Sequence, residues 1–376
     1  MDGGLIRDPE KVGVAREGLE KAIQLLEEQR EQGLQDGAQL FVARKGQPLL
    51  DIAIGEAQPA VPLRTDSVML WFSAGKPLTS VAIAQQIERG KLSLDDRIQS
   101  YIPEFTNGKE AVTIRNVLTH TGGFPMNNFP FLRYDWDTAI QKICEEPAEW
   151  EPGTEAGYHP LSGWCILGEI VRRVDGRPIE VYLEEEIARP LGMKDTTLGI
   201  SEARATELGD RLSQISERSA QPINMEAWND PRARRRTLPG GTCYGPAHDL
   251  GRLYLALWNG GEWEGTHILK KETVDLFTAT HRKNMVDRIF LVNWGVEVRS
   301  PWGLGFQKGP YEPMVTIFGR QCTPSAYGHG GNRSSLGFVE PSRDLVVAIA
   351  TNGLPDREKA ILRMYNISDT IHSACL

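Results

Sequence analysis

Two stretches near opposite ends of the chain have the pattern of paired β-strands, and they restrict the possible folds most. "AQLFVARKGQPLLDIAIGEA" has two apolar runs around Lys45-Gly46, and "SSLGFVEPSRDLVVAIATNG" has two around the turn from Pro341 to Asp344. Each pattern is typical of a β-hairpin. Apolar residues at helical spacing precede the first hairpin, from Arg16 to Arg30, and follow the second, from about Asp356 to the C-terminus.

The middle of the chain consists of helix-and-loop segments with Gly and Pro stops, such as "SVAIAQQIERGKLSLDDRIQSYIPEF" and "AHDLGRLYLALWNGG". The simplest arrangement is an α+β fold of the α/β sandwich type. Strands from both termini form one antiparallel sheet flanked by the terminal helices. We predict a discontinuous sheet domain over 1–70 and 285–376, a mostly helical inserted lobe over 71–284, and an active site in the cleft between them.

The composition is that of a globular protein, with 40% hydrophobic and 24% charged residues among 376. A net charge of −8 argues against nucleic acid or an anionic membrane as the partner. The first residues, "MDGGLIRDPEKVGVAREGLEK", lack the apolar core of a secretory signal, and no apolar run approaches the length of a membrane span. The five scattered cysteines form no C-x-x-C pair, which favours reduced thiols and a cytoplasmic location.

The stretch "VMLWFSAGKPLTS" contains Ser73 and Lys76 where an apolar run becomes helical. Positions i and i+3 of a helix share a face, so the lysine can hold the serine hydroxyl. With a pKa lowered by burial, it can also accept the serine proton. The pattern S-x-x-K occurs about once by chance in a chain of this length, so the motif needs support from the rest of the sequence.

Other polar residues lie in turns before helices or strands. Tyr158 and His159 precede a helix, and His329-Gly330-Gly331 leads into a strand. A lone tyrosine is more often a packing residue, and paired glycines can serve a β-bulge. For His120, in "VLTHTGGFP", we favour a structural role, and Cys243 lacks the partners of a reactive thiol.

Taken together and in this order, these segments resemble the serine β-lactamase and penicillin-binding protein superfamily. The similarity is greatest to the class C-like branch, with its family VIII carboxylesterases, D-amino-acid peptidases, amidases and acyltransferases. "SAGK" matches the S-x-x-K motif. "GKLSLDDRIQSYIPEF", "IRNVLTHTGGFP", "RPLGMKDTTLG" and "HGGNRSSLGFVEPSRDLVVAIATN" match flanking segments of that branch, so the resemblance covers most of the chain. It implies the β-lactamase/transpeptidase fold.

The resemblance also implies roles for individual residues. Ser73 is expected to be the nucleophile and Lys76 the general base or proton relay. Tyr158 matches the tyrosine of the Y-x-N motif, which carries a proton between serine and leaving group. The oxyanion hole is expected from the backbone N–H groups of Ser73 and Asn332. His329 takes the place of the lysine in K-T-G, and Gly330 and Gly331 let a substrate approach the strand closely.

Two departures from the family pattern bear on specificity. The Y-x-N asparagine, which contacts the amide side chain of β-lactams, is missing because the sequence continues His159-Pro160. A neutral histidine in place of the K-T-G lysine holds a substrate carboxylate less firmly. Both changes resemble the esterase and D-peptidase end of the family. We suggest His159 as a substitute polar contact.

The leading hypothesis is therefore a serine hydrolase that cleaves an ester, or less readily an amide, of a small molecule through a Ser73 acyl-enzyme. The first alternative passes the acyl group to an amine or alcohol acceptor. Others are a β-lactamase or D-peptidase type of amide hydrolase and an inactive binding protein on the same fold. No P-loop, H-E-x-x-H or histidine cluster is present, and we predict neither cofactor nor metal.

Three segments allow two interpretations each. The basic run "PRARRRT" favours a solvated loop over a binding site for a substrate carboxylate. The aromatic-rich "MNNFPFLRYDW" and "NWGVEVRSPWGLGF" either line the entrance to the site or form a lid packed on itself.

Overall fold

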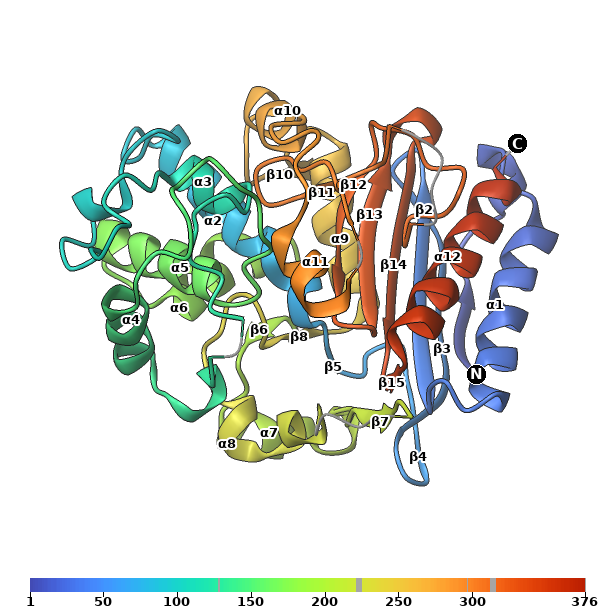
Figure 1. The fold of residues 1–376 in the computed structure, drawn as a ribbon. Helices are drawn as coiled ribbons and strands as arrows, with labels where there is room; N and C mark the ends of the chain where they lie inside the picture. Colours follow the sequence, from blue (N-terminus) through green and yellow to red (C-terminus); the bar gives the residue numbers. More distant parts are fainter. Residues whose placement is uncertain (128, 221–224, 296, 312–315, 376) are drawn as a thin grey trace.

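The main sheet joins the two ends of the chain, as the sequence predicts. The computed structural model describes the chain except residues 128, 221–224, 296, 312–315 and 376. The strand order is β1-β3-β2-β14-β13-β12-β11, with β4 beside β3 and every pairing antiparallel (Figure 1). The strands are β1 (Asp2–Leu5), β2 (Gly37–Arg44), β3 (Gln47–Gln58), β4 (Val61–Pro62), β11 (Gln307–Lys308), β12 (Tyr327–Gly331), β13 (Ser335–Glu340) and β14 (Leu345–Thr351).

Both predicted hairpins are present. Strands β2 and β3 are joined by Lys45 and Gly46, whose φ angles of 50° and 70° suit a tight hairpin turn. Strands β13 and β14 are joined through a single 3₁₀ turn, after which Asp344 has a φ of 49°. Pairing of β2 with β14 then brings the two hairpins into one sheet.

The terminal helices α1 (Arg16–Glu31) and α12 (Arg357–Ala374) lie side by side on one face of this sheet (Figure 1). Successive side chains of β14 point to opposite faces of the sheet, and apolar residues lie on both faces. Leu345, Val347 and Ile349 pack with the terminal helices, whereas the alternate residues of the strand belong to a larger core on the opposite face. The predicted fold class is therefore confirmed.

Helix α9 (Ala247–Trp258) covers the opposite face of the sheet. Gly251 permits the close approach, because a Cβ atom there would lie 2.3 Å from Cδ1 of Phe41. Since α9 falls within 71–284 and contacts the sheet directly, the proposed division into a sheet domain and an inserted lobe stays a prediction.

Most of the remaining elements form the helical side of the molecule, which is built around the almost wholly buried helix α2 (Lys76–Glu88). Its neighbours include α5 (Ser162–Asp175), α6 (Ile179–Leu183) and α10 (Lys271–Thr278). The other elements are β5 (Met69–Leu70), α3 (Ile114–Leu118), α4 (Trp136–Glu145), β6 (Thr197–Leu198), α7 (Glu202–Leu208), β7 (Ser216–Arg218), α8 (Pro231–Arg234), β8 (Cys243–Gly245), β9 (Glu262–Trp263), β10 (Thr266–His267), α11 (Arg288–Trp294) and β15 (Gly353–Pro355).

Candidate active site

Ser73 lies in a short 3₁₀ turn that connects strand β5 to the buried helix α2. The preceding residue, Phe72, has a φ of 49°, a left-handed conformation that costs a side-chain-bearing residue about 1 kcal/mol or more. Phe72 is buried and its ring packs edge-on against Trp228 at 5.1 Å, which helps to hold it there. Strained backbone of this kind is common beside functional residues.

Lys76 is hydrogen-bonded to the serine hydroxyl. Its Nζ lies 2.8 Å from Ser73 Oγ, 2.6 Å from the main-chain oxygen of Pro160 and 2.8 Å from that of Gly240. An ammonium group can donate to all three oxygens. A neutral amine can donate to the two carbonyls and turn its lone pair toward the Ser73 hydroxyl, so the same contacts suit both protonation states.

Burial favours the neutral form of this lysine. The Lys76 side chain is completely buried, and its Nζ lies 5.3 Å and 5.2 Å from the ring centroids of Tyr158 and Trp164. Desolvation lowers the pKa of Lys76 well below its usual range. The lowered pKa makes the neutral amine, which can accept a proton from Ser73, more accessible.

Tyr158 is the third member of this group. Burial raises the pKa of its phenol above the usual value, although an interaction with the Ser73 side chain acts in the opposite direction. The ring packs 4.6 Å from that of His120, which in turn stacks on Trp164 at 4.9 Å. Tyr158 therefore stays protonated and can pass a proton to a group bound beside Ser73.

His120 has the surroundings of a structural residue. It is completely buried, and its Nδ1 accepts a hydrogen bond of 3.0 Å from the backbone N–H of His159. Trp302 packs against it at 4.5 Å and also lies 5.5 Å from the ring of His329. His120 and Trp302 thus form an aromatic wall behind Tyr158.

Strand β12 passes directly over the turn that carries Ser73. A Cβ atom at Gly331 would lie 1.9 Å from the main-chain oxygen of Trp71 and 3.1 Å from the backbone nitrogen of Ala74, so only glycine fits. Asn332 follows at the exposed end of the strand, with its Nδ2 3.8 Å from Met225 Sδ. The predicted oxyanion donors, the N–H groups of Ser73 and Asn332, therefore belong to adjacent segments.

The ring of His329 also lies beside this aromatic wall, and it is a neutral imidazole. Its Nδ1 lies 2.7 Å from the main-chain oxygen of Gly330, which requires Nδ1 to carry the proton. Burial lowers the pKa of His329 to about 3, and the nearby Lys76 acts in the same direction. At the position of the family's K-T-G lysine, the side chain is therefore uncharged.

The side chain of His159 is fully engaged with the backbone. Its Nε2 accepts from the N–H of Phe124 at 3.1 Å, and its Nδ1 lies 2.7 Å from the oxygen of Gly157. The residue is completely buried, so neither ring nitrogen is available to a substrate. In the Tyr158-His159-Pro160 segment it is the main-chain carbonyl of Pro160 that reaches Lys76.

The sequence does not predict that the carbonyls of Pro160 and Gly240 accept from Lys76, because any residue type can supply a main-chain acceptor. The glycine itself is a signal, since a Cβ atom at position 240 would lie 2.8 Å from Lys76 Nζ. Asp287, which bonds the backbone N–H of Tyr158 at 3.1 Å, was missed as well. It is separated from Tyr158 by more than a hundred residues of sequence.

The three segments that allow two interpretations differ in what the structure shows for each. Pro231–Arg234 of the basic run is a short helix, and Arg232 at its start is exposed and paired with Asp230. In the first aromatic segment, Phe129 packs on Phe131 and Tyr134, so that part contacts itself. The second contributes Trp302 to the wall behind Tyr158. Residues 128 and 296 of these two segments lie outside the described part of the chain.

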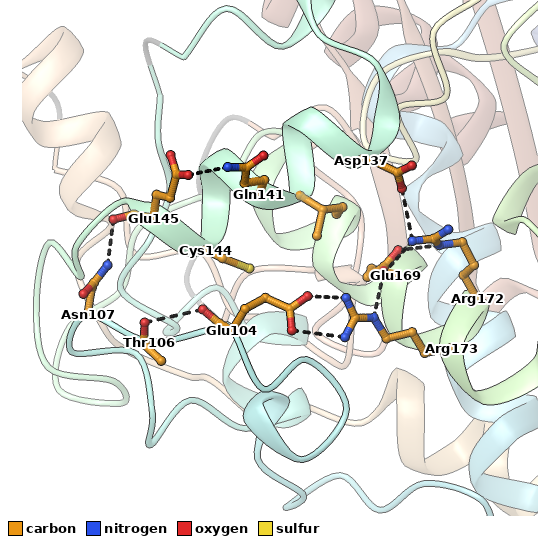
Figure 2. Close-up of a pocket in the computed structure, with 11 residues that line it drawn as sticks. Glu104, Thr106, Asn107, Asp137, Gln141, Cys144, Glu145, Glu169, Arg172 and Arg173 are labelled. Carbon is orange, nitrogen blue, oxygen red and sulfur yellow. Dashed lines mark hydrogen bonds and ion pairs between the residues drawn. The ribbon is translucent and has the colours of Figure 1, made fainter.

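A separate hollow of about 410 Å³ lies between α4, α5 and the loop around residues 104–107 (Figure 2). Its two arginines are occupied: Arg172 and Arg173 both pair with the buried carboxylate of Glu169, and also with Asp137 and Glu104 respectively. The Cys144 thiol in its wall is buried, which raises its pKa to about 11. This hollow therefore offers neither an unpaired arginine nor a reactive thiol.

Among the described residues, no group of histidine, cysteine and carboxylate side chains could hold a metal ion. Within the same residues, no helix is long and apolar enough to cross a membrane.

A serine hydrogen-bonded to a buried lysine and accompanied by a tyrosine, at the start of a buried helix beside a sheet strand, defines a serine acyl-transfer site of the S-x-x-K class. The chain belongs to the Beta-lactamase family, whose model matches residues 22–370, and the fold is that of its serine hydrolases. The resemblance seen in the sequence is thereby confirmed.

Three similar proteins illustrate the range of the family. A putative D-alanyl-D-alanine carboxypeptidase of Escherichia coli K12 is 26% identical over 302 residues, which are 73% of this chain and 66% of the relative. A penicillin-binding protein homologue from Caulobacter crescentus is 27% identical with a TM-score of 0.80, covering 96% of this chain and 99% of that one. A family VIII carboxylesterase is 24% identical with a TM-score of 0.79, covering 97% and 99%. The chain thus spans about two thirds of the carboxypeptidase relative.

Proposed function

We propose that this protein hydrolyses carboxylic esters of small molecules through an acyl-enzyme on Ser73. The observation that carries the proposal is the 2.8 Å contact between Ser73 Oγ and the Nζ of the buried Lys76, whose other two contacts are carbonyl oxygens. Such an amine is held with its basic electron pair available only to the serine. This is the arrangement that an activated nucleophile requires.

The reaction follows from these contacts. Ser73 Oγ attacks the ester carbonyl while its proton passes to Lys76. The oxyanion is stabilised by the N–H groups of Ser73 and Asn332, and the leaving alkoxide takes a proton through Tyr158. Water then attacks the acyl-enzyme, its proton follows the same route in reverse, and the acid and free Ser73 are released.

The surroundings of the site favour neutral, apolar esters. His329 is uncharged, so it offers no cation to a substrate carboxylate. The ring of Tyr158 adds apolar surface, with Phe290 6.3 Å from that ring. A peptide ending in D-alanine carries a carboxylate, so the activity named for the E. coli relative has less support here.

Acyl transfer to an amine or alcohol uses the same residues and differs only in the molecule that attacks the acyl-enzyme. Nothing in the geometry of Ser73, Lys76 and Tyr158 separates water from another acceptor. Hydrolysis is proposed because it needs no additional acceptor-binding group.

The test compares a neutral ester, its amide analogue and an ester of the same size that bears a carboxylate. We expect the neutral ester to be turned over with the highest kcat/KM, and Ser73→Ala to lower that value at least about 10³-fold. Ser80→Ala, a buried serine on the same helix, serves as the control and should keep most of the activity. Full turnover by Ser73→Ala would refute the mechanism, and faster cleavage of the amide would refute the substrate class. A preference for added amine or alcohol over water would favour the transferase.

A further inference from the structure

Asp287 is a buried carboxylate beside the site that the proposed reaction does not use. Its Oδ1 accepts hydrogen bonds from the backbone N–H of Tyr158 at 3.1 Å, of Ile289 at 3.2 Å and of Phe290 at 3.4 Å. The last two bonds cap the N-terminus of helix α11. One oxygen atom therefore fixes both the backbone of Tyr158 and the start of that helix.

Arg282 holds the other oxygen of this carboxylate. The Arg282 Nη2 and Asp287 Oδ2 atoms are 3.7 Å apart, and both side chains are only 2% exposed. Arg282 Nη1 also donates to the main-chain oxygen of Thr119 at 2.9 Å, next to His120, and the guanidinium lies 5.5 Å from the ring centroid of Trp302. The cation thus links Asp287 to the aromatic wall behind Tyr158.

A buried ion pair is weak support for stability, because desolvating both charges offsets most of their attraction. Burial raises the pKa of Asp287 and lowers that of Arg282 to about 10, so desolvation disfavours the charged form of both groups. A pair of this kind beside a catalytic group is better explained by the geometry it imposes.

The backbone reinforces that geometry. Ala156 and Asp287 form a parallel bridge, and the N–H of Arg288 donates to the oxygen of Ala156 at 2.8 Å. The segment leading to Tyr158 therefore runs beside the segment that begins α11. A shift of Asp287 would move the phenol relative to Ser73.

We infer that Asp287 is a positioning residue for Tyr158, with its carboxylate held from the other side by Arg282. The inference rests on the proposed function, in which Tyr158 transfers the proton to the leaving group. Asp287 itself is assigned no contact with substrate.

A double-mutant cycle tests this role with a neutral activated ester. Asp287→Ala is made alone and in a Tyr158→Phe background, and kcat and KM are measured separately. A misplaced phenol should lower kcat about 10- to 100-fold with little change in KM. In the Tyr158→Phe background the same change should alter kcat by less than about threefold, because no phenolic proton remains to be positioned. An equal loss of kcat in both backgrounds would overturn the inference.

Three further variants separate positioning from folding. Asp135→Ala removes the cap of α4, where Asp135 accepts from the N–H of Thr138 at 2.9 Å, and should leave kcat unchanged. Asp287→Asn keeps an acceptor oxygen and should restore most of kcat. Asp287→Ser can cap α11 but is too short to hold Tyr158 as well, so it replaces the alanine variant in the cycle if that variant does not fold by circular dichroism.

The cycle also keeps the two proposals distinct. If Tyr158→Phe alone leaves kcat unchanged, the proton-transfer role of Tyr158 fails and the proposed mechanism with it. If Tyr158→Phe lowers kcat and the effect of Asp287→Ala is additive, only the positioning role fails.

Discussion

At the scale of single residues, the proposed chemistry depends on a lysine whose neutral form is favoured by burial. Lys76 must be unprotonated to accept the Ser73 proton, and desolvation lowers its pKa in the folded protein. As pH falls through that lowered pKa, the amine becomes charged and the base is lost. The raised pKa of Tyr158 and the pKa of about 3 at His329 keep both groups from titrating near neutral pH.

We therefore predict a plot of kcat/KM against pH with an acid limb that belongs to Lys76. Lys76→Met should lower kcat by about 10²- to 10⁴-fold, the usual contribution of general acid–base catalysis. Its residual rate should lack the wild-type acid limb. Steady-state kinetics across the pH range checks this, with His329→Gln as a control that should retain the limb. An unchanged acid limb in Lys76→Met would assign it to another group.

Substrate charge is predicted to depend on position 329. His329→Lys places an ammonium group where the wild-type imidazole is neutral, so KM for a carboxylate-bearing ester should fall about tenfold relative to its neutral analogue, or about 1.4 kcal/mol. His329→Gln should change both values alike. Equal KM changes for both esters in His329→Lys would show that the substrate carboxylate does not reach this residue.

At the scale of elements, the site is the contact between strand β12 and the turn that begins α2. Ser335 Oγ, at the start of the neighbouring strand β13, donates to the main-chain oxygen of Trp71, and glycine at 331 lets the backbones of β12 and the turn meet. The distance from Ser73 to the proposed oxyanion donor at Asn332 therefore depends on backbone packing.

Gly331→Ala should separate the strand from the turn, because its Cβ would meet the rigid main-chain oxygen of Trp71. We expect kcat/KM to fall about 100-fold, the effect of misplacing a reacting group by an ångström or so. Gly330→Ala should cost less, since its Cβ meets the end of the Ile317 side chain, which can rotate. Kinetic constants and melting temperatures of both variants test this ranking, and the reverse order would contradict it.

At the scale of the whole molecule, both ends of the chain are fastened to one sheet, and a buried arginine on α12 joins several of their segments. Arg363 donates to the oxygen of Leu34, to Gln35 Oε1 and to the oxygens of Arg333 and Gly353. The side chain is 1% exposed, so each acceptor would lose its partner without access to water. These bonds link the C-terminal helix to the residues just before β2, to the loop after β12 and to the start of β15.

Arg363→Ala should lower the free energy of unfolding by about 3 kcal/mol, the upper part of the range for hydrogen bonds to a charged group. Arg363→Lys keeps the charge but loses the planar fork of donors, and it should fall between alanine and wild type. Urea denaturation followed by circular dichroism measures both. A wild-type unfolding midpoint for Arg363→Ala would mean that these bonds contribute nothing to stability.

The sequence predicted the parts of this structure that repeat a local pattern. The turns at Lys45-Gly46 and Pro341–Asp344, and the terminal helices, follow from turn residues and apolar spacing within short windows. The packing of α9 on the sheet could not be predicted in this way, because it depends on a contact between residues about two hundred positions apart. The S-x-x-K pattern identified Ser73 and Lys76, whereas the acceptors of Lys76 are main-chain atoms and Asp287 is distant in sequence.

The most direct test of the central proposal is the mass of the intact protein during reaction with a small activated ester. We expect a transient increase equal to the acyl group on the wild type, localised to Ser73 by peptide mapping, and no increase on Ser73→Ala. Its decay in water at the rate of turnover would identify a hydrolase, and faster decay with an added amine would identify a transferase. Turnover without any adduct on Ser73, or an adduct that forms equally on Ser73→Ala, would contradict the proposed acyl-enzyme.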